Sequence, residues 1–330
     1  MPASPTAAAD RPRPGLPASP APPRKRAMRS VGGTGMAASQ GMQEEEAPEA
    51  LLARLEGAAR RHETPCGEGR MVWHLWGEAA AEPLVLLHGG SGSWRHWARN
   101  LETLARHRLV LCPDLPGLGE SAMPPPAADP APVAAIVRAG ILALLGTEAG
   151  RPRAYDLCGF SFGALLSGHV AAQSGAELRS VTLVGAGALG PRRQVTELTK
   201  VRSLEGEARV AAHRHNLAAL MFADPRNIDP LALAIQEWNT RRARFQSRGF
   251  AGSTSLRDAI AAARCPVALL YGERDAIAWP EVELRFQALR AVQPEAWTGV
   301  IPGAGHWVAY EAAAAFDAML LEMLARRLGR

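Results

Sequence analysis

Short apolar segments alternate with helix-length segments along most of this 330-residue chain. Seven apolar segments are bounded by turn residues: MVWHLW (71–76), PLVLLHG (83–89), RLVLCPD (108–114), AYDLCGFS (154–161), SVTLVGAG (180–187), PVALLYG (266–272) and WTGVIPG (297–303). The intervening stretches include helical patterns at 133–145, 162–174, 281–291 and 307–328. Strands buried on both faces have continuous apolar sequences, and parallel strands need helical crossovers. The pattern predicts an α/β protein whose mainly parallel sheet carries helices on both faces.

One interval is much longer than an ordinary crossover. Residues 188–264 separate two of the predicted strands, and their pattern is helical, with charges interleaved among NLAALMF and PLALAIQEWNTRRARF. We interpret 188–264 as an inserted helical cap and 49–187 with 265–330 as the core. A cap above the carboxyl ends of the strands covers the place where parallel sheets bind ligands.

The formal charge of +5 is concentrated at the amino terminus. Residues 1–30 hold six of the 37 basic residues and one of the 32 acidic ones, so residues 31–330 balance at 31 of each sign. We expect residues 1–48, rich in Pro and Ala, to form a disordered basic arm, since they cannot bury enough apolar surface to fold. The balanced remainder argues against a nucleic-acid partner.

The cysteines and the apolar pattern bear on the cellular compartment. Cys66, Cys112, Cys158 and Cys265 show no CxxC spacing, and three lie in or beside apolar runs, which favours buried reduced thiols. The chain shows neither a secretory signal nor an uncharged apolar stretch of about 18 residues. We therefore expect a cytoplasmic protein with no membrane partner.

Polar residues follow five of the predicted strands. His88 and two glycines follow the second strand, Asp114 the third, Ser161 the fourth, Asp275 the sixth and His306 the last. The carboxyl ends of parallel strands meet at one edge of a sheet. A serine hydroxyl becomes a nucleophile when an imidazole takes its proton, and the imidazole needs a carboxylate to fix its tautomer. Ser161, Asp275 and His306 are the candidate nucleophile, acid and base.

Alternatives exist for each of these residues. Ser161 lies in the short pattern G-x-S-x-G and could be an ordinary turn serine. Asp275 competes with Glu273 and with Asp114, whose DLPGLGES context is typical of a turn. For the base the candidates besides His306 are His88, His96, His169, His213 and His215. Only His306 follows the last strand, and His88 is better suited to hydrogen bonding within its own loop.

Backbone donors are needed for the oxyanion that forms when a serine attacks a carbonyl. A tight turn at Ser161 directs the N–H group of the next residue, Phe162, towards that charge, and the glycine-rich loop HGGSGSW supplies a second N–H, which we assign to Gly90. This chemistry requires no metal and no organic cofactor.

These motifs together resemble the α/β-hydrolase family over about residues 70–328. The resemblance rests on HGG, DLPGLGES, GFSFG, GERDAI and GAGHW, which occur in family order, each at a strand end. It implies the α/β-hydrolase fold, with an eight-stranded, mostly parallel sheet and a cap, and it gives Ser161, Asp275 and His306 the roles of nucleophile, acid and base. The serine nucleophile argues against epoxide hydrolases and haloalkane dehalogenases, which use Asp.

Within the family, some details are similar to hydrolases that cleave C–C bonds in aromatic ring-fission products. Asn100 and GHWVAYE match them, whereas Phe160 and Phe162 stand where those enzymes usually have Asn and Met. The arginine that binds the substrate carboxylate has no clear counterpart, because Arg241, Arg242 and Arg244 come slightly late. The expected activity is hydrolysis of a small or medium apolar carboxylic ester or related carbonyl compound through an acyl-serine intermediate, and C–C cleavage is the alternative.

Further residues are expected to contact a small-molecule substrate. These candidates lie in the glycine-rich loop, beside the nucleophile, in the cap and after the base: Gly89, Ser91, Asn100, Phe160, Trp238, Arg242 and Trp307. Trp94 and Trp97, three positions apart, fit local packing better. A binding protein that retains the fold without turnover is a third hypothesis, disfavoured because a pure binder need not keep Ser, Asp and His together.

Overall fold

A computed structural model of the chain describes residues 46–127, 129–148, 150–191, 196–246 and 253–325. The basic arm expected over 1–48 therefore lies outside the described residues except for its last three positions. Helix α1 (Pro48–Gly57) begins at the last position of that range, with a proline in its first turn.

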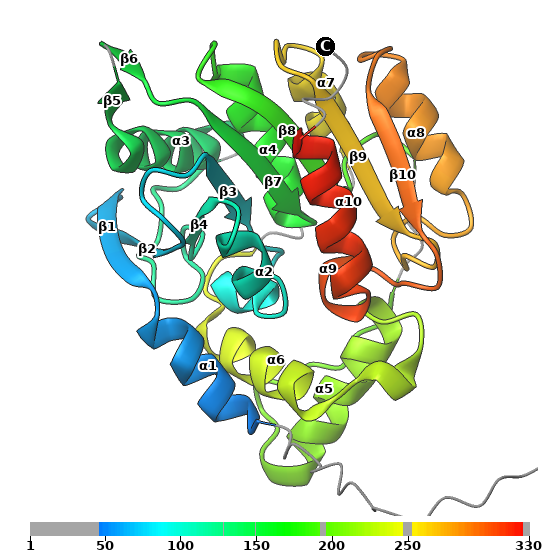
Figure 1. Cartoon of the computed structure of the whole chain (residues 1–330). Coiled ribbons are helices and arrows are strands. Elements are labelled where there is room, and N and C mark those ends of the chain that lie inside the picture. Colours follow the sequence, from blue (N-terminus) through cyan, green and yellow to red (C-terminus); the bar gives the residue numbers. More distant parts are fainter. Residues whose placement is uncertain (1–45, 128, 149, 192–195, 247–252, 326–330) are drawn as a thin grey trace, which may run out of the picture. The chain divides into compact units, whose positions relative to one another are not determined.

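An eight-stranded sheet forms the centre of the described structure (Figure 1). In order across the sheet, the strands are β1 (Arg60–Cys66), β2 (Gly69–Trp76), β4 (Leu109–Pro113), β3 (Pro83–Leu87), β7 (Tyr155–Phe160), β8 (Leu178–Val184), β9 (Val267–Gly272) and β10 (Trp297–Ile301). The pairs β1–β2 and β2–β4 are antiparallel, and all other neighbours are parallel. The predicted mainly parallel sheet is confirmed. A separate short pair joins β5 (Thr147–Glu148) to β6 (Arg151–Pro152).

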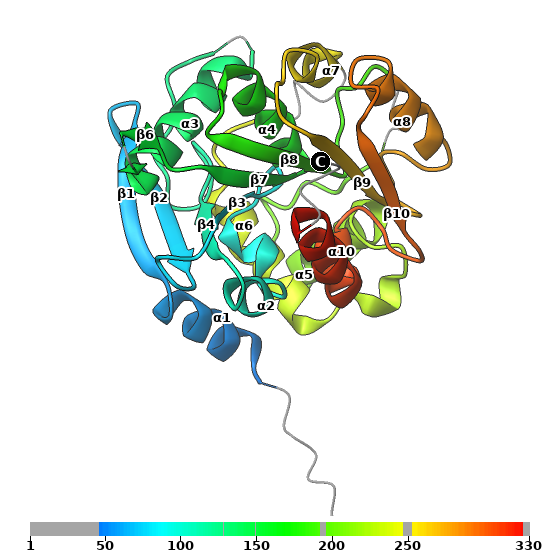
Figure 2. The same cartoon turned by 45° about the horizontal axis from the view of Figure 1, so that its top comes forward.

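Helices cover both faces of the sheet, as Figure 2 shows. One apolar core takes side chains from α3 (Ala131–Leu145), α4 (Phe162–Gln173), α7 (Ser255–Ile260) and α8 (Val282–Arg290). The other takes them from α1, α2 (Leu101–Ala105), α9 (Val308–Glu311) and α10 (Ala313–Ala325). Along β3, Val85 and Leu87 belong to the first core and Leu84 and Leu86 to the second. Both faces are buried, which explains why the strand sequences are continuously apolar.

Two further helices lie beyond the carboxyl ends of the strands (Figure 1). They are α5 (Gly206–Leu220) and α6 (Pro230–Arg242), joined through the short η2 (Pro225–Asn227). The Asp229 carboxylate accepts a hydrogen bond from the Ala232 N–H and so caps α6. Within the segment interpreted as the cap, 188–264, Leu256 of α7 lies beside Gly168 of α4 and belongs to one of the apolar cores.

Two further observations concern compartment and redox state. Within the described ranges, none of the helices combines enough length with enough apolar character to cross a bilayer. Cys66, Cys112, Cys158 and Cys265 are all unpaired, and all except Cys265 are buried.

Candidate active site

Strand register brings the polar strand ends together at one edge of the sheet. Leu87 of β3 pairs with Gly159 of β7, and Phe160 pairs with Val184 of β8. Val184 in turn pairs with Leu270 of β9. The residues that directly follow these strand ends therefore lie side by side at one edge of the sheet.

Ser161 occupies the turn between β7 and α4. Its φ of 53° and ψ of −110° are unusual for a residue with a side chain, and such a conformation costs about 1–3 kcal/mol. The flanking glycines permit the turn: a Cβ on Gly159 would lie 2.3 Å from the Gly163 carbonyl oxygen, and one on Gly163 would lie 2.3 Å from the Leu87 carbonyl oxygen. Strain of this kind exposes the serine at the sheet edge.

The structure brings Ser161, His306 and Asp275 into one hydrogen-bonded chain. His306 Nε2 lies 3.0 Å from Ser161 Oγ, and its Nδ1 lies 2.9 Å from both carboxylate oxygens of Asp275. A carboxylate only accepts, so Nδ1–H donates to Asp275 and Nε2 accepts the Ser161 proton. Asp275 is fully buried and also accepts the Ile277 N–H at 2.9 Å. The imidazole is therefore oriented with its unprotonated nitrogen towards the Ser161 hydroxyl.

The two competing acids lie elsewhere. Asp114 accepts hydrogen bonds from the N–H groups of Trp94 and Glu120, so it organises its own glycine-rich turn. Burial raises the pKa of Asp114 to about 6. Glu273 accepts the Gly303 N–H at 2.8 Å, on the surface.

His88 and His96 support the site from the loop after β3. His88 Nδ1 donates to the Gly89 carbonyl and Nε2 accepts the Leu115 N–H, which fixes a neutral tautomer. Burial lowers the pKa of His88 to about 4. His96 Nδ1 accepts the Gly89 N–H at 3.3 Å, and burial holds the pKa of His96 well below its usual value. Both imidazoles are therefore uncharged near neutral pH.

Hydrogen bonds hold the loop that carries His306 in place. The Trp307 N–H donates to the Met221 carbonyl at 2.8 Å. The Glu311 carboxylate accepts the N–H groups of Gly305 at 2.7 Å and Ala223 at 2.9 Å. The chain after α5 and the loop after β10 are thereby held together, which orients the imidazole.

Positive electrostatic potential is available beside the nucleophile. The first N–H groups of a helix have no intrahelical acceptor, and Phe162 is the first residue of α4. The positive end of the 12-residue α4 dipole therefore lies at Ser161. Gly90 borders the same space.

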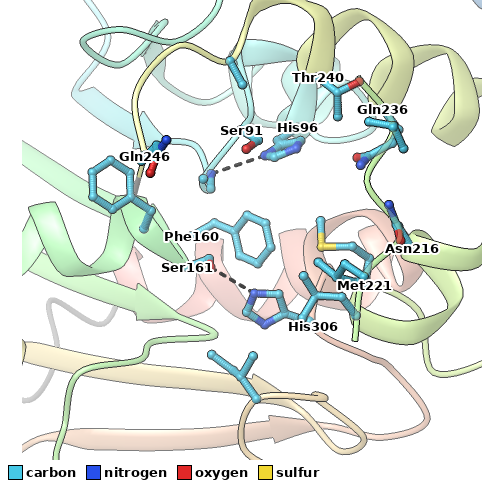
Figure 3. Close-up of a pocket in the computed structure, with 18 of the residues that line it drawn as sticks. Ser91, His96, Phe160, Ser161, Asn216, Met221, Gln236, Thr240, Gln246 and His306 are labelled. Carbon is cyan, nitrogen blue, oxygen red and sulfur yellow. Dashed lines mark hydrogen bonds between the residues drawn. The ribbon is translucent and has the colours of Figure 1, made fainter. Parts of the chain in front are cut away.

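A cavity of about 820 Å³ opens on Ser161 (Figure 3). Besides Ser161 and His306, five of the sequence-predicted residues line it: Gly89, Gly90, Ser91, Phe160 and Phe162. In Figure 3, Gln236 and Thr240 of α6 lie across the cavity from Ser161 and His306. Helices α5 and α6 therefore supply the wall facing the nucleophile.

Four residues expected to contact substrate do not line this cavity. Asn100 is fully buried and donates to the Ala309 carbonyl and to Asp317, both at 2.8 Å. Trp307 is also buried, and its Nε1–H donates to the His96 carbonyl while its ring stacks on Tyr310 at 4.2 Å. Neither residue therefore faces the cavity: the Asn100 amide nitrogen and the Trp307 indole nitrogen bond to other parts of the chain instead.

The other two belong to a cation–π stack outside the cavity. The ring of Trp238 lies between the guanidinium groups of Arg95, at 3.6 Å, and Arg242, at 4.1 Å. Trp238 and Arg242, predicted to bind substrate, are thus engaged with each other and are not among the residues that line the cavity.

Sequence reasoning missed most of the cavity wall. The unanticipated residues come mainly from the chain around α5 and α6 and include Thr199, Lys200, Arg202, Arg209, Asn216, Met221, Gln236, Thr240 and Gln246. His96 was noted as a histidine but not as a lining residue. The sequence signal for an apolar helix face is weak here, because α5 and α6 mix charged and apolar residues throughout.

One group of side chains among the described residues has the composition of a metal site. Ligand atoms of Glu56, His74 and Glu120 lie within 4.8 Å of one another. Arg95 donates to Glu56 at 2.9 Å, so a guanidinium already compensates charge there. Burial, with Arg95 nearby, lowers the pKa of His74 to about 4.

Comparison with known proteins agrees with this architecture. A family model described as "Alpha/beta hydrolase family" matches residues 84–318. The 2-hydroxy-6-oxo-2,4-heptadienoate hydrolase of Pseudomonas putida is 29% identical over 281 residues, covering 78% of this chain and 96% of the relative. The dihydrolipoyllysine-residue acetyltransferase component of the acetoin cleaving system of Pseudomonas putida is 29% identical over 310 residues, covering 86% and 78%.

Solved structures share the fold at low sequence identity. Naproxen esterase (carboxylesterase NP) from Bacillus subtilis superposes with a TM-score of 0.64 at 16% identity, covering 84% of this chain and 95% of that one. An esterase from Rhodococcus sp. ECU1013 superposes with a TM-score of 0.63 at 20% identity, covering 81% and 98%. The predicted fold is confirmed.

Proposed function

The chain belongs to the alpha/beta hydrolase family, and from that premise we propose that it is a serine hydrolase that cleaves a small or medium carboxylic ester through an acyl-serine intermediate. The observation that carries the proposal is the hydrogen-bonded chain from Ser161 through His306 to Asp275, facing a cavity of about 820 Å³. The esterases among the structural neighbours add support.

In the proposed mechanism each step of ester hydrolysis has a residue to carry it. Ser161 Oγ attacks the carbonyl carbon while its proton passes to His306 Nε2, and the buried Asp275 stabilises the imidazolium. The resulting oxyanion accepts hydrogen bonds from the N–H groups of Phe162 and Gly90. Collapse returns the proton to the leaving alkoxide and leaves the acyl group on Ser161. Water, deprotonated by Nε2, then releases the acid and regenerates the hydroxyl.

Apolar side chains border the reacting end of the cavity. Apolar residues in the lining include Phe160, Phe162, Leu165, Met221 and Ile277. Such a wall favours an apolar acyl or alcohol group and excludes water from the oxyanion.

Cleavage of a C–C bond in an aromatic ring-fission product is the second candidate, favoured by the 29% identical Pseudomonas putida hydrolase. It needs a cation for the substrate carboxylate near the serine. Of the three arginines considered, Arg242 stacks on Trp238, and Arg244 donates to the Gly119 and Ser121 carbonyls. Arg241 lines the cavity but is hydrogen-bonded to Glu237. This arrangement favours the ester.

A fluorophosphonate probe tests the nucleophile. We expect labelling of the folded wild type at Ser161, loss of labelling in Ser161→Ala, and retention in Ser91→Gly, which removes a second hydroxyl from the same cavity. Absence of labelling in folded wild type contradicts the serine mechanism.

The bond that is cleaved is tested separately. Short and medium aryl esters are compared with a 2-hydroxy-6-oxo-dienoate, using wild type and Ser161→Ala. Rapid loss of the dienoate chromophore with negligible ester turnover selects the second candidate. Turnover of neither substrate class in labelled protein contradicts both.

A further inference from the structure

A segment of chain before α5 is fixed in place along the cavity. We call residues 199–204 the α5 strap. The Thr199 N–H donates to Asn216 Oδ1 at 2.8 Å, and the Thr199 carbonyl accepts from Asn216 Nδ2 at 2.9 Å. Arg209 Nη1 donates to the Val201 carbonyl at 2.6 Å. Asn216 and Arg209 both belong to α5, so two points on either side of residue 200 are tied to one helix.

The strap places two cations on the cavity wall. Lys200 and Arg202 line the cavity and are exposed, so they lie where it opens to solvent. Among the described residues, neither side chain has an ion pair with a carboxylate. By contrast Arg209 and Arg241, which also line the cavity, share the carboxylate of Glu237.

No Asp or Glu contributes to the described lining of this cavity. Glu197 and Glu205 flank the strap in sequence, but Glu197 borders a separate hollow and Glu205 immediately precedes α5. The cavity therefore joins an apolar end at Ser161 to a positively charged mouth. Like charges lining one side of a cleft raise the local concentration of an oppositely charged ligand.

We propose that Lys200 and Arg202 form a subsite for an anionic group, a carboxylate or a phosphate, carried by the substrate at its end remote from the scissile ester. This inference rests on the proposed function, because it describes the substrate of the same cavity. The substrate is then an ester with an apolar portion at Ser161 and an anion at the mouth. The ammonium and guanidinium groups both suit carboxylate and phosphate oxygens.

Matched substrates measure the subsite. Para-nitrophenyl hexanoate is compared with the mono-para-nitrophenyl ester of adipic acid, which has the same acyl length and a terminal carboxylate, and with longer pairs up to sebacic acid. A para-nitrophenyl ester with a terminal phosphate replaces the carboxylate in a third arm and distinguishes the two anions. The quantity compared is kcat/KM for the anionic ester divided by that for its neutral partner.

Neutral variants identify the cations. Exposed ion pairs contribute modestly, so we expect Lys200→Met and Arg202→Met each to lower this ratio by about two- to five-fold, mainly through KM. The ratio in wild type also falls in about 0.5 M NaCl, where screening is strong. Lys200→Arg retains the preference. Arg106→Met is the control, because it removes the same charge from an exposed position away from the cavity.

Chemical labelling gives a readout independent of turnover. The sequence contains only two lysines, Lys25 and Lys200. Reductive methylation of full-length Ser161→Ala, read by peptide mass spectrometry, therefore reports on Lys200 with Lys25 as internal reference. We expect the carboxylate ester to slow methylation of Lys200 but not of Lys25, and the neutral ester to slow neither.

The outcomes separate this inference from the proposed function. The subsite is overturned if the protein turns over esters but Lys200→Met and Arg202→Met leave the ratio of kcat/KM values unchanged. It is also overturned if Arg106→Met lowers that ratio equally. Either result leaves the proposed serine hydrolase function intact. Selective protection of Lys200 without turnover of any ester supports the subsite and contradicts the ester function.

Discussion

Replacing Asp317 by Asn changes how the stability of this protein depends on pH. Asp317 lies on α10 with 3% of its surface exposed, and its carboxylate accepts the Asn100 Nδ2–H at 2.8 Å. Burial raises the pKa of Asp317 from 3.8 to about 7, and the hydrogen bond from Asn100 only partly offsets this effect. Ionised Asp317 is therefore less favourable in the folded state than in the unfolded state.

The sign and size of the effect follow from proton binding. Below pH 3.8 the carboxyl is protonated in both states and contributes nothing. Between 3.8 and about 7 the folded state retains a proton that the unfolded chain has lost, so the free energy of unfolding falls as pH rises. Above about 7 the loss is complete. At 1.36 kcal/mol per pH unit the loss amounts to roughly 4 kcal/mol at most.

Asn at this position accepts the same hydrogen bond without a charge. We expect Asp317→Asn to match wild type at low pH and to exceed its free energy of unfolding by a few kcal/mol, on the order of 2–4, near pH 8. Asp114, whose burial also raises its pKa, remains in both proteins, so the difference between their curves isolates Asp317.

The assay is urea unfolding followed by tryptophan fluorescence at several pH values. Asp258→Asn removes an exposed carboxylate and serves as the control. The pKa of Asp258 is lowered rather than raised, so this variant is not expected to increase the free energy of unfolding at high pH. A difference between Asp317→Asn and wild type that does not grow with pH would refute the reasoning, as would a variant less stable than wild type near pH 8.

Three further predictions concern the site and the helices opposite it. Asp275→Asn lowers kcat for an aryl ester on the order of 10³–10⁴-fold, because His306 loses the acceptor that sets its tautomer; a loss below ten-fold contradicts the triad. Gly185→Ala places a Cβ 3.0 Å from the His306 ring, and we expect it to lower kcat. The control Gly303→Ala also introduces a side chain at positive φ but has no atom within 4 Å of the new Cβ, so it lowers the free energy of unfolding alone. Equal losses of kcat in the two variants would exclude the contact with His306 as the cause. Glu237→Gln lowers the free energy of unfolding at neutral pH by about 1 kcal/mol, allowing for solvent screening. Hydrogen bonds hold the pKa of Glu237 at about 2. In chemical denaturation, the difference in free energy of unfolding between wild type and Glu237→Gln therefore shrinks as pH falls from 4.5 towards that value. A difference that stays constant with pH would contradict a stabilising role of the Glu237 charge.

The fold, and the meeting of Ser161, Asp275 and His306, could be predicted from sequence because their signals are local. A strand buried on both faces must be apolar along its whole length, so β3, β4, β7, β8 and β9 are visible as runs. The carboxyl ends of parallel strands share an edge, so Ser161, Asp275 and His306, which follow such strands, were expected at the same edge of the sheet. Gly159 and Gly163 mark the turn for an equally local reason, the space that a Cβ would need.

The cavity wall depended on contacts between distant parts of the chain. Asn100 bonds to Ala309 and Asp317, more than 200 positions away, and Trp307 bonds to His96. The sequence around Asn100 and Trp307 gives no sign of these distant partners, so both residues resembled substrate-binding residues. Lys200 lines the cavity because Asn216 and Arg209 tie its backbone neighbours to α5. The sequence by itself determined which polar residues stand at the carboxyl ends of the strands. Tertiary packing alone decided which side chains line the cavity, because a side chain on a loop or a mixed helix turns towards whichever partner the rest of the fold presents.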